Sequence, residues 1–327
     1  MTQSTPRAQA VNPWLVIAFI SIPVFIGSLD LTVVSAFLPE LIIELQLPLQ
    51  TNIDDASWVV SGYLLAYTIS LTFTGRLSDL IGRKAVYVTC LLIFIVGSVL
   101  VATAQGAPSD WLFRILRRMG QRPDPAAIDL IAVVIGRVIQ AIGAGALVPV
   151  SMALVGDMFP PERRAQPLGF IGALDTLGWV LGHLYGGLFL QLPVPIGFAE
   201  SIGHTVIPLE GNPEMATLPW QGLFWMNVPL TLIALAMVLW GLRNVPATRS
   251  GGRFDYAGTG LLVAALIVLN VALGANIDTS GATDFDSLSQ LPPYAIPGVI
   301  VSIVLFAAFF FVEARVPDPL IRLELWR

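Results

Sequence analysis

The chain has 327 residues, of which 55% are hydrophobic and 12% are charged, and its formal net charge is −5 at pH 7. Soluble domains contain about 25% charged residues, so this composition argues against a soluble globular protein. The negative net charge lacks the basic character of a nucleic-acid-binding domain. One cysteine and two histidines are too few for an internal disulfide or a structural zinc site. We therefore expect no nucleic-acid partner, metal or cofactor.

Long apolar runs dominate the sequence. A bilayer core about 30 Å thick needs roughly 20 apolar helical residues to cross it, and eight runs of about that length carry little or no charge. They are Trp14–Leu38, Ser57–Thr74, Ala85–Gln105, Leu130–Gly156, Pro167–Leu192, Phe224–Leu242, Tyr256–Asn276 and Tyr294–Val312. Each run is apolar around its whole circumference, as in helices that lie in lipid. The pattern predicts an all-α polytopic membrane bundle with eight transmembrane helices.

The basic residues predict the orientation of these helices. With both termini on one side, most Lys and Arg residues fall on that side, and four arginines fall on the other. Because cytoplasmic loops carry the excess of basic residues, we expect both termini in the cytoplasm of a multi-pass plasma-membrane protein. The expected organisation is a cytoplasmic tail at 1–13, a six-helix bundle at 14–242, a cytoplasmic linker at 243–255, two additional transmembrane helices at 256–313 and a truncated cytoplasmic segment at 314–327.

Two polar segments on the outer side have different patterns. Between Ser109 and Gly120 the apolar and arginine side chains fall on opposite helical faces, which predicts a helix lying in the headgroup layer. The alternative is a solvated loop with chance periodicity. The segment Pro193–Gly222 is rich in Pro and Gly, and it is predicted to be an outer loop rather than a folded domain.

Ionisable residues inside the apolar runs are candidate functional positions, because a charge near the bilayer centre costs about 2.5–3.5 kcal/mol on insertion scales. Asp30 and Arg137 lie in the first and fourth runs, and we interpret them as facing a common cavity. The alternative is an ion pair that only fixes helix packing. Asp175 and His183 in the fifth run are candidate proton carriers. Their alternative is a hydrogen-bonded pair of packing residues.

Small and aromatic residues complete the candidate set. Gly178, Gly182 and Gly186 follow at steps of four, with Gly187 beside them, and this spacing lets a second helix approach closely. The glycines indicate either a sliding interface or ordinary helix packing. Deep in the second run, Tyr63 and Tyr67 are predicted to line a substrate cavity together with Gln140.

A short polar turn joins the second and third runs. Gly82 permits a sharp turn there, and Asp79 lies close in sequence to cations at a helix end. The turn resembles the major facilitator superfamily, whose signature in this loop is G-x-L-a-D-r-x-G-r-k. The matching residues are Gly75, Leu77, Asp79, Gly82, Arg83 and Lys84, and Leu80 stands where a basic residue is usual. The resemblance implies a cytoplasmic gate formed by Gly75, Asp79, Gly82, Arg83 and Lys84.

Other segments resemble the fourteen-span drug:proton antiporter branch of that superfamily. Leu29–Pro39 is similar to its first-span motif L-D-x-T-V-V-x-x-A-L-P, and Arg137–Gly145 to its fourth-span motif R-x-x-Q-G-x-G. Gly178–Gly187 resembles the motif G-x-x-x-G-P-x-x-G-G, with His183 at the proline position. Trp220–Pro229 resembles the branch's entry to the sixth span.

The resemblance implies a rocker-type transporter with a six-helix bundle, two additional helices and a second six-helix bundle. That second bundle is absent here, so we expect either an N-terminal fragment or a half completed by a second chain. The implied function is proton-coupled efflux of amphipathic small molecules or drugs by alternating access, within a lipid bilayer. The alternative is a nontransporting membrane scaffold or assembly partner, and we do not expect an enzyme.

Overall fold

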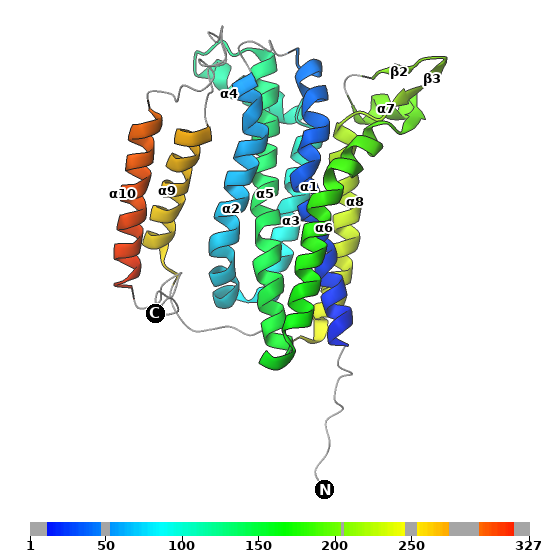
Figure 1. The fold of residues 1–327 in the computed structure, drawn as a ribbon. Coiled ribbons are helices and arrows are strands. Elements are labelled where there is room, and N and C mark those ends of the chain that lie inside the picture. Colours follow the sequence, from blue (N-terminus) through cyan, green and yellow to red (C-terminus); the bar gives the residue numbers. More distant parts are fainter. Residues whose placement is uncertain (1–11, 47–52, 204–205, 246–253, 275–293, 317–327) are drawn as a thin grey trace.

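The computed structural model describes residues 12–46, 53–203, 206–245, 254–274 and 294–316. Long helices run side by side and alternate in direction along the chain (Figure 1). Their bounds are α1 (Pro13–Glu44), α2 (Ile53–Ile81), α3 (Arg83–Ala102), α5 (Pro125–Met158), α6 (Ala165–Leu190), α8 (Gln221–Gly241), α9 (Tyr256–Gly274) and α10 (Ala295–Glu313). The predicted tail 1–13, linker 243–255 and last segment 314–327 lie largely outside the described residues, as does the predicted end of the seventh span at Asn276.

The predicted all-α membrane bundle is confirmed. Within the described residues, seven helices are long and apolar enough to cross a membrane, namely α1, α2, α3, α5, α8, α9 and α10. The remaining predicted span, Pro167–Leu192, forms α6, a helix of 26 residues. Its glycines, Asp175 and His183 lower its hydropathy below that of the other seven helices. Helix α6 packs along α1 with one face (Figure 1), and its other face, with Val180, Leu184 and Leu188, is exposed.

Local sequence explains where α1 begins and where α2 ends and α3 begins. Asn12 caps α1, because its Oδ1 accepts a hydrogen bond from the backbone N of Trp14 at 3.0 Å. Helix α2 ends at Ile81, and Gly82 has φ 114°, a conformation that glycine adopts without strain. Helix α3 then begins at once, at Arg83. Gly75, by contrast, lies inside α2, where an added Cβ would meet Pro149 at an ordinary 3.9 Å.

Close helix contacts at glycines form the centre of the bundle. A Cβ added to Gly143 of α5 would lie 2.5 Å from the carbonyl O of Cys90 in α3. A Cβ added to Gly97 of α3 would overlap the backbone of Gln140 in α5. Such contacts let α3 and α5 approach to backbone distance. They hold the backbone of Gln140 against α3.

The outer connections are more ordered than a loop prediction implies. Residues 193–217 form β1 (Pro193–Pro195), α7 (Ile196–Ile202), β2 (Pro208–Leu209) and β3 (Asn212–Thr217), and the strands make one antiparallel sheet in the order β1-β3-β2. The prediction of an outer loop did not include these short strands and the short helix α7. Pro193 and Pro195 occupy β1, an edge strand, where a missing N–H donor is tolerated.

The predicted interfacial segment is a helix. Helix α4 (Ala107–Arg118) lies at the end of the bundle where α3 ends and α5 begins (Figure 1). Arg114, Arg117 and Arg118 are exposed, whereas Leu112, Ile115 and Leu116 are partly buried. The predicted separation into an apolar and a basic face is therefore confirmed for α4.

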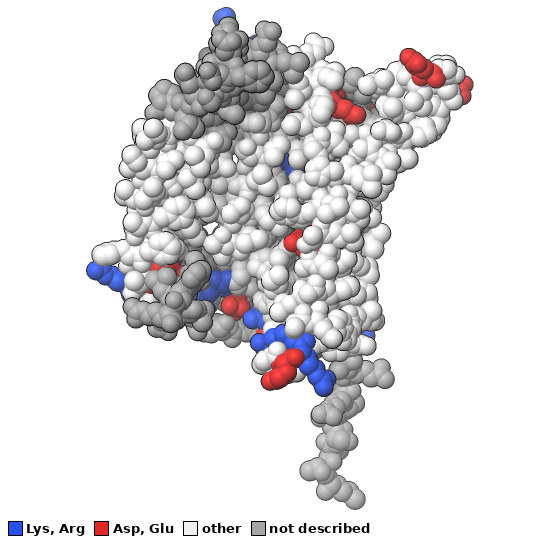
Figure 2. Space-filling view, in the orientation of Figure 1, with Lys and Arg blue, Asp and Glu red and all other residues white. Residues whose placement is uncertain are grey.

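Charged side chains are unevenly distributed on the surface. In Figure 2 the middle of the visible face is mostly uncharged, and most visible Lys and Arg side chains gather at the end where α1 begins. This arrangement suits a protein whose middle lies in hydrocarbon.

Candidate functional site

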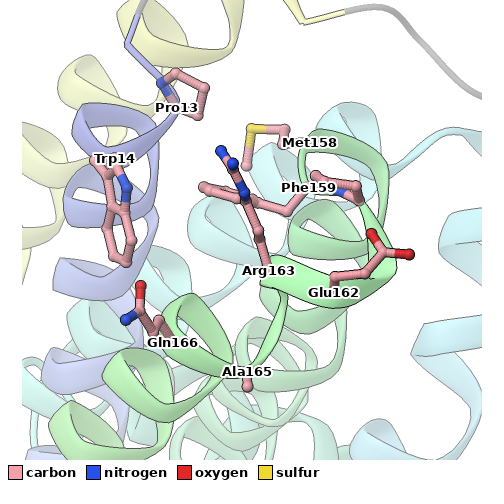
Figure 3. Close-up of a pocket in the computed structure, with 9 residues that line it drawn as sticks. Pro13, Trp14, Met158, Phe159, Glu162, Arg163, Ala165 and Gln166 are labelled. Atoms are coloured by element: carbon pink, nitrogen blue, oxygen red, sulfur yellow. The ribbon is translucent and has the colours of Figure 1, made fainter.

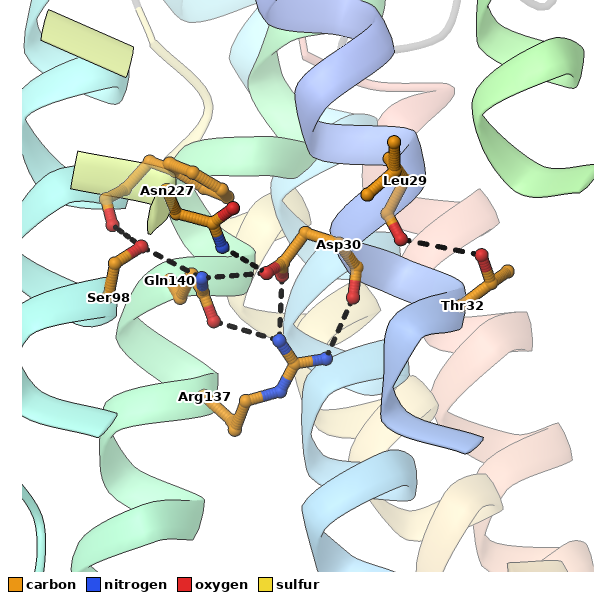
Figure 4. Close-up of polar contacts among 8 residues, drawn as sticks. Leu29, Asp30, Thr32, Ser98, Arg137, Gln140 and Asn227 are labelled. Carbon is orange, nitrogen blue, oxygen red and sulfur yellow. Dashed lines mark hydrogen bonds and ion pairs between the residues drawn. The ribbon is translucent and has the colours of Figure 1, made fainter. Parts of the chain in front are cut away.

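A buried polar cluster occupies the centre of the helix bundle, and its core is the carboxylate of Asp30 in α1 (Figure 4). Arg137 Nη1 of α5 donates to Asp30 Oδ2 at 2.7 Å, and Gln140 Nε2 donates to Oδ1 at 3.0 Å. Asn227 Nδ2 of α8 also donates to Oδ1, at 2.6 Å. Gln140 Nε2 further donates to Ser98 Oγ of α3 at 2.9 Å. The structure thus joins Asp30 and Arg137 in an ion pair, the contact that the sequence analysis gave as the alternative to a common cavity. A cavity shared by the two residues stays a prediction.

The guanidinium of Arg137 is enclosed by aromatic rings as well as by oxygen acceptors. Its Cζ lies 3.9 Å from the ring centre of Tyr63 in α2 and 5.6 Å from that of Phe224 in α8. Arg137 Nη1 also donates to Gln140 Oε1 at 2.8 Å. Aromatic faces attract cations most strongly where water is excluded. Together with Asp30, these groups hold the cation without solvent.

Burial decides what this cluster can do chemically. Asp30 is 1% exposed and Arg137 is 0% exposed, so the ion pair is sealed from water in this conformation. Removing either partner would leave the other charge buried without compensation, which costs free energy. The pair therefore ties α1 to α5 in this conformation.

Two members of the cluster escaped the sequence reasoning. Ser98 and Asn227 lie in apolar runs and are 0% and 4% exposed. Buried polar side chains are nearly always hydrogen-bonded, so an uncharged polar residue inside a predicted span was an available signal. The partner of Ser98 is Gln140 and that of Asn227 is Asp30. Both partners are distant in sequence, so only the fold reveals these contacts.

Removing the third donor to Asp30 tests the cluster. We expect Asn227→Ala to lower the free energy of unfolding by about 1.5–3 kcal/mol, the range for a hydrogen bond to a charged group. Denaturant unfolding in detergent micelles measures the change. Thr176→Ala is the control, because the exposed Thr176 hydroxyl bonds to the carbonyl of Gly172 in its own helix. Equal losses in the two variants would contradict the assignment of Asn227.

The structure does not bring Asp175 and His183 together. Asp175 Oδ1 accepts a short hydrogen bond from Ser28 Oγ of α1, whereas the His183 side chain is exposed. His183 lies eight residues after Asp175 on α6. A role in proton transfer stays a prediction for Asp175 and for His183, and each residue would have to bind the proton by itself.

Three of the four predicted packing glycines contact α1. A Cβ on Gly178 would lie 2.8 Å from the carbonyl O of Phe25, one on Gly182 would overlap Thr32 and Leu29, and one on Gly186 would lie 2.6 Å from the Cβ of Ala36. At Gly187 the same Cβ would meet nothing within 4 Å. Helix α1 thus packs against the surface of α6 formed by Gly178, Gly182 and Gly186, and Gly187 lies outside that surface.

The tight turn is a charge cluster at the end of the bundle where α1 begins. Arg83 Nη2 lies 3.1 Å from Asp79 Oδ1, and Arg83 Nη1 lies 2.5 Å from Asp157 Oδ2 near the end of α5. Lys84 Nζ donates to the carbonyl O of Leu242 at 3.4 Å. These contacts join the ends of α2, α3, α5 and α8. Asp157 is a partner that the sequence reasoning missed, since it lies 74 residues after Arg83.

The two predicted cavity tyrosines are buried in this conformation. Tyr63 and Tyr67 are 1% and 8% exposed, and their rings stack with centres 6.2 Å apart. A cavity of about 650 Å³ lies instead near the start of α1, between Trp14 and the connection from α5 to α6, and contains Glu162 and Arg163 (Figure 3). The substrate-lining role of Tyr63, Tyr67 and Gln140 stays a prediction.

These observations define a helical membrane protein that buries an ion pair between its helices. Residues 20–321 match the family model of the Major Facilitator Superfamily. The chain belongs to the Major Facilitator Superfamily, a family of membrane transporters and not of enzymes, and the family resemblance of the tight turn is confirmed.

Curated relatives and solved structures agree with this membership. A triacylglyceride transporter of Mycobacteroides abscessus is 31% identical over 304 residues, which cover 93% of this chain and 48% of the relative. A triacylglyceride transporter of Mycobacterium tuberculosis is 31% identical over 303 residues, covering 91% and 48%. The chain thus spans about half the length of these relatives. The fold resembles a partially occluded, inward-open xylose transporter XylE from E. coli, with TM-score 0.50, 15% identity, and coverage of 91% of this chain and 58% of XylE.

Proposed function

We propose that this chain forms the N-terminal half of a proton-coupled transporter that moves an amphipathic or lipid-like molecule across the membrane by alternating access. The observation that carries the proposal is the sealed pair of Asp30 and Arg137, which holds a titratable carboxylate at the centre of the bundle. Charges placed inside membrane helices commonly mark ion and substrate pathways. The alternating motion would open this pair to water on one side at a time.

Within this proposal, Asp30 binds the coupling proton and Arg137 returns it. The carboxylate accepts from Arg137, Gln140 and Asn227. Protonation weakens the hold on Arg137 and frees α1 to move relative to α5. When Arg137 pairs again with the carboxylate, it favours loss of the proton. The termini would lie in the cytoplasm of the plasma membrane, and the charge cluster around Arg83 would close that side.

The substrate proposed first is an acylglycerol-type lipid, and the second is an amphipathic drug. The relatives named triacylglyceride transporters support the lipid, because their similarity extends over nearly the whole of this chain. The drug candidate derives from the motif resemblance at Leu29–Pro39 and Gly178–Gly187. A second six-helix bundle, supplied by a longer protein or by a second chain, would complete the substrate cavity.

A nontransporting scaffold is the second candidate function. The observation that favours it is the exposed His183, which replaces the proline of the antiporter motif. In that case the polar cluster would only fix helix packing, and the chain would bind a partner without moving a solute.

Proteoliposomes with an imposed pH gradient separate these functions. The chain is reconstituted alone and together with a separately expressed second six-helix bundle, and transport of a fluorescent triacylglyceride and of ethidium is followed. We expect gradient-driven movement that Asp30→Asn abolishes and that the control Glu200→Gln, at an exposed acid of α7, leaves at half or more of its rate. Gradient-driven transport unchanged in Asp30→Asn would reject Asp30 as the proton site. No transport in either reconstitution would reject the transporter proposal in favour of the scaffold.

A further inference from the structure

An apolar groove of about 680 Å³ lies between α4 and the adjoining parts of α3 and α5. Its walls include Leu100 of α3, Trp111 and Leu112 of α4, and Ala132 and Ile135 of α5. Trp111 is 62% exposed and Ile135 is 45% exposed, so the groove opens to the outer surface of the bundle. Its size falls within the range of about 300–1,000 Å³ found for small-molecule sites. In a membrane, the medium at this opening is lipid.

A row of arginines borders the groove. Arg114 lines it, and Arg118 lies four residues further on the same face of α4. Arg117 and Arg122 are exposed beside them, whereas the segment 107–124 contains two acidic residues, Asp110 and Asp124. Among the described residues, none forms an ion pair with Arg114, Arg117 or Arg118. The mouth of an apolar groove thus carries cations whose charge is available to an anion.

We propose that this groove binds an anionic phospholipid, with one acyl chain between α3, α4 and α5 and the phosphate held by Arg114 and Arg118. The apolar walls suit the chain, and guanidinium groups bind phosphate oxygens in a fork geometry. Basic residues next to membrane helices attract anionic lipid headgroups. This inference stands apart from the transport proposal, since it needs neither a proton nor a transported solute.

The arrangement favours a lipid over a free anion. A free phosphate gains nothing from the apolar walls, whereas a phospholipid satisfies both the walls and the arginines. The cavity near the start of α1 differs in this respect, because it contains Glu162 beside Arg163 and so has no net preference for anions. Gly136 also lines the groove and precedes Arg137. A bound acyl chain therefore contacts the turn of α5 that holds the central ion pair.

Native mass spectrometry of the purified full chain in detergent tests the headgroup contacts. The probes are phosphatidylglycerol, phosphatidylcholine and glycerol phosphate. We expect one tightly bound phosphatidylglycerol, and Arg114→Gln/Arg118→Gln should weaken it about 25-fold, because each arginine near an anionic lipid contributes roughly a factor of five. Arg163→Gln/Arg243→Gln is the matched control, since both of those arginines are exposed at the other end of the bundle, and it should leave binding unchanged.

A second pair of variants tests the groove itself. Ile135→Trp fills the groove and should reduce the bound lipid at least tenfold. Ile131 is one turn away on α5, is 44% exposed, and does not line the groove. Ile131→Trp should therefore bind phosphatidylglycerol as the unsubstituted chain does. The two tryptophans face lipid on the same helix, so a general effect of the added ring would appear in both.

Three results with these probes and variants would overturn the proposal, and a fourth would come from the chain's own acidic residues. The first three are equal binding of phosphatidylcholine and phosphatidylglycerol, competition by glycerol phosphate as strong as by the lipid, and equal losses in Ile135→Trp and Ile131→Trp. The connection 275–293 contains Asp278, Asp284 and Asp286. If lipid binds only after these three are changed to Asn, the chain's own acidic segment occupies the arginines, and the lipid assignment is wrong.

Discussion

Replacing Arg137 with methionine is expected to lower the free energy of unfolding by about 3–5 kcal/mol, the range for breaking a buried ion pair. The carboxylate of Asp30 would stay buried at 1% exposure without its cation, and methionine supplies no donor in its place. Thermal or denaturant unfolding of the purified chain in micelles measures the loss. Arg163→Met is the control at an exposed arginine, where we expect a change within about 0.5 kcal/mol.

The double variant Asp30→Asn/Arg137→Met separates the charge from the packing. With no uncompensated charge left in the core, it should recover most of the stability that Arg137→Met loses, because replacing a buried pair by neutral groups is often close to neutral in stability. It should still lack proton-coupled transport. An Arg137→Met chain as stable as the unsubstituted one would contradict the sealed ion pair, and so would a double variant no more stable than Arg137→Met.

The second large effect is expected at the interface of α1 and α6. Gly182→Val should destabilise the bundle by about 1–3 kcal/mol or more, the cost of forcing extra atoms into a packed contact. The new Cβ would overlap Thr32 Oγ1 and the carbonyl O of Leu29, and α6 would have to move away from α1. That movement would also break the hydrogen bond from Thr32 Oγ1 to the carbonyl O of Trp179, now 3.0 Å long.

Gly187→Val is the matched control on the same helix. A Cβ at Gly187 meets nothing within 4 Å, so we expect a change within about 0.5 kcal/mol. Unfolding curves of the two variants in the same detergent give the comparison. Helix propensity cannot explain a loss, because valine favours a helix more than glycine does. If both variants lose equal stability, the loss does not arise from the contact with α1, and the role assigned to Gly182 is wrong.

The candidate site was partly predictable from sequence because a charge in an apolar run is visible without a fold. Asp30 and Arg137 stand out for this reason, and the structure places them 2.7 Å apart. Asn227 is an uncharged residue that gives a weaker signal, although it makes a 2.6 Å hydrogen bond to the same carboxylate. Asp157 is visible as an acid near a helix end, but only the fold places it beside Arg83.

The helix bundle was more predictable than the outer connections. Seven of the eight apolar runs form helices able to cross a membrane, because a bilayer demands long uninterrupted apolar segments whatever the tertiary contacts are. The sheet of β1, β2 and β3 was missed, since strands of two to six residues leave too short a pattern for period-two alternation to be recognised.

Sequence alone thus determined that the chain is a helical membrane protein of a transporter family with charge inside its spans, because hydropathy and local motifs are properties of neighbouring residues. The tertiary structure decided which charges meet, that Asp175 pairs with Ser28 while His183 is exposed, and that three glycines of α6 seat α1. These outcomes depend on contacts between residues far apart in the chain. Their geometry is set by how closely the helix backbones approach.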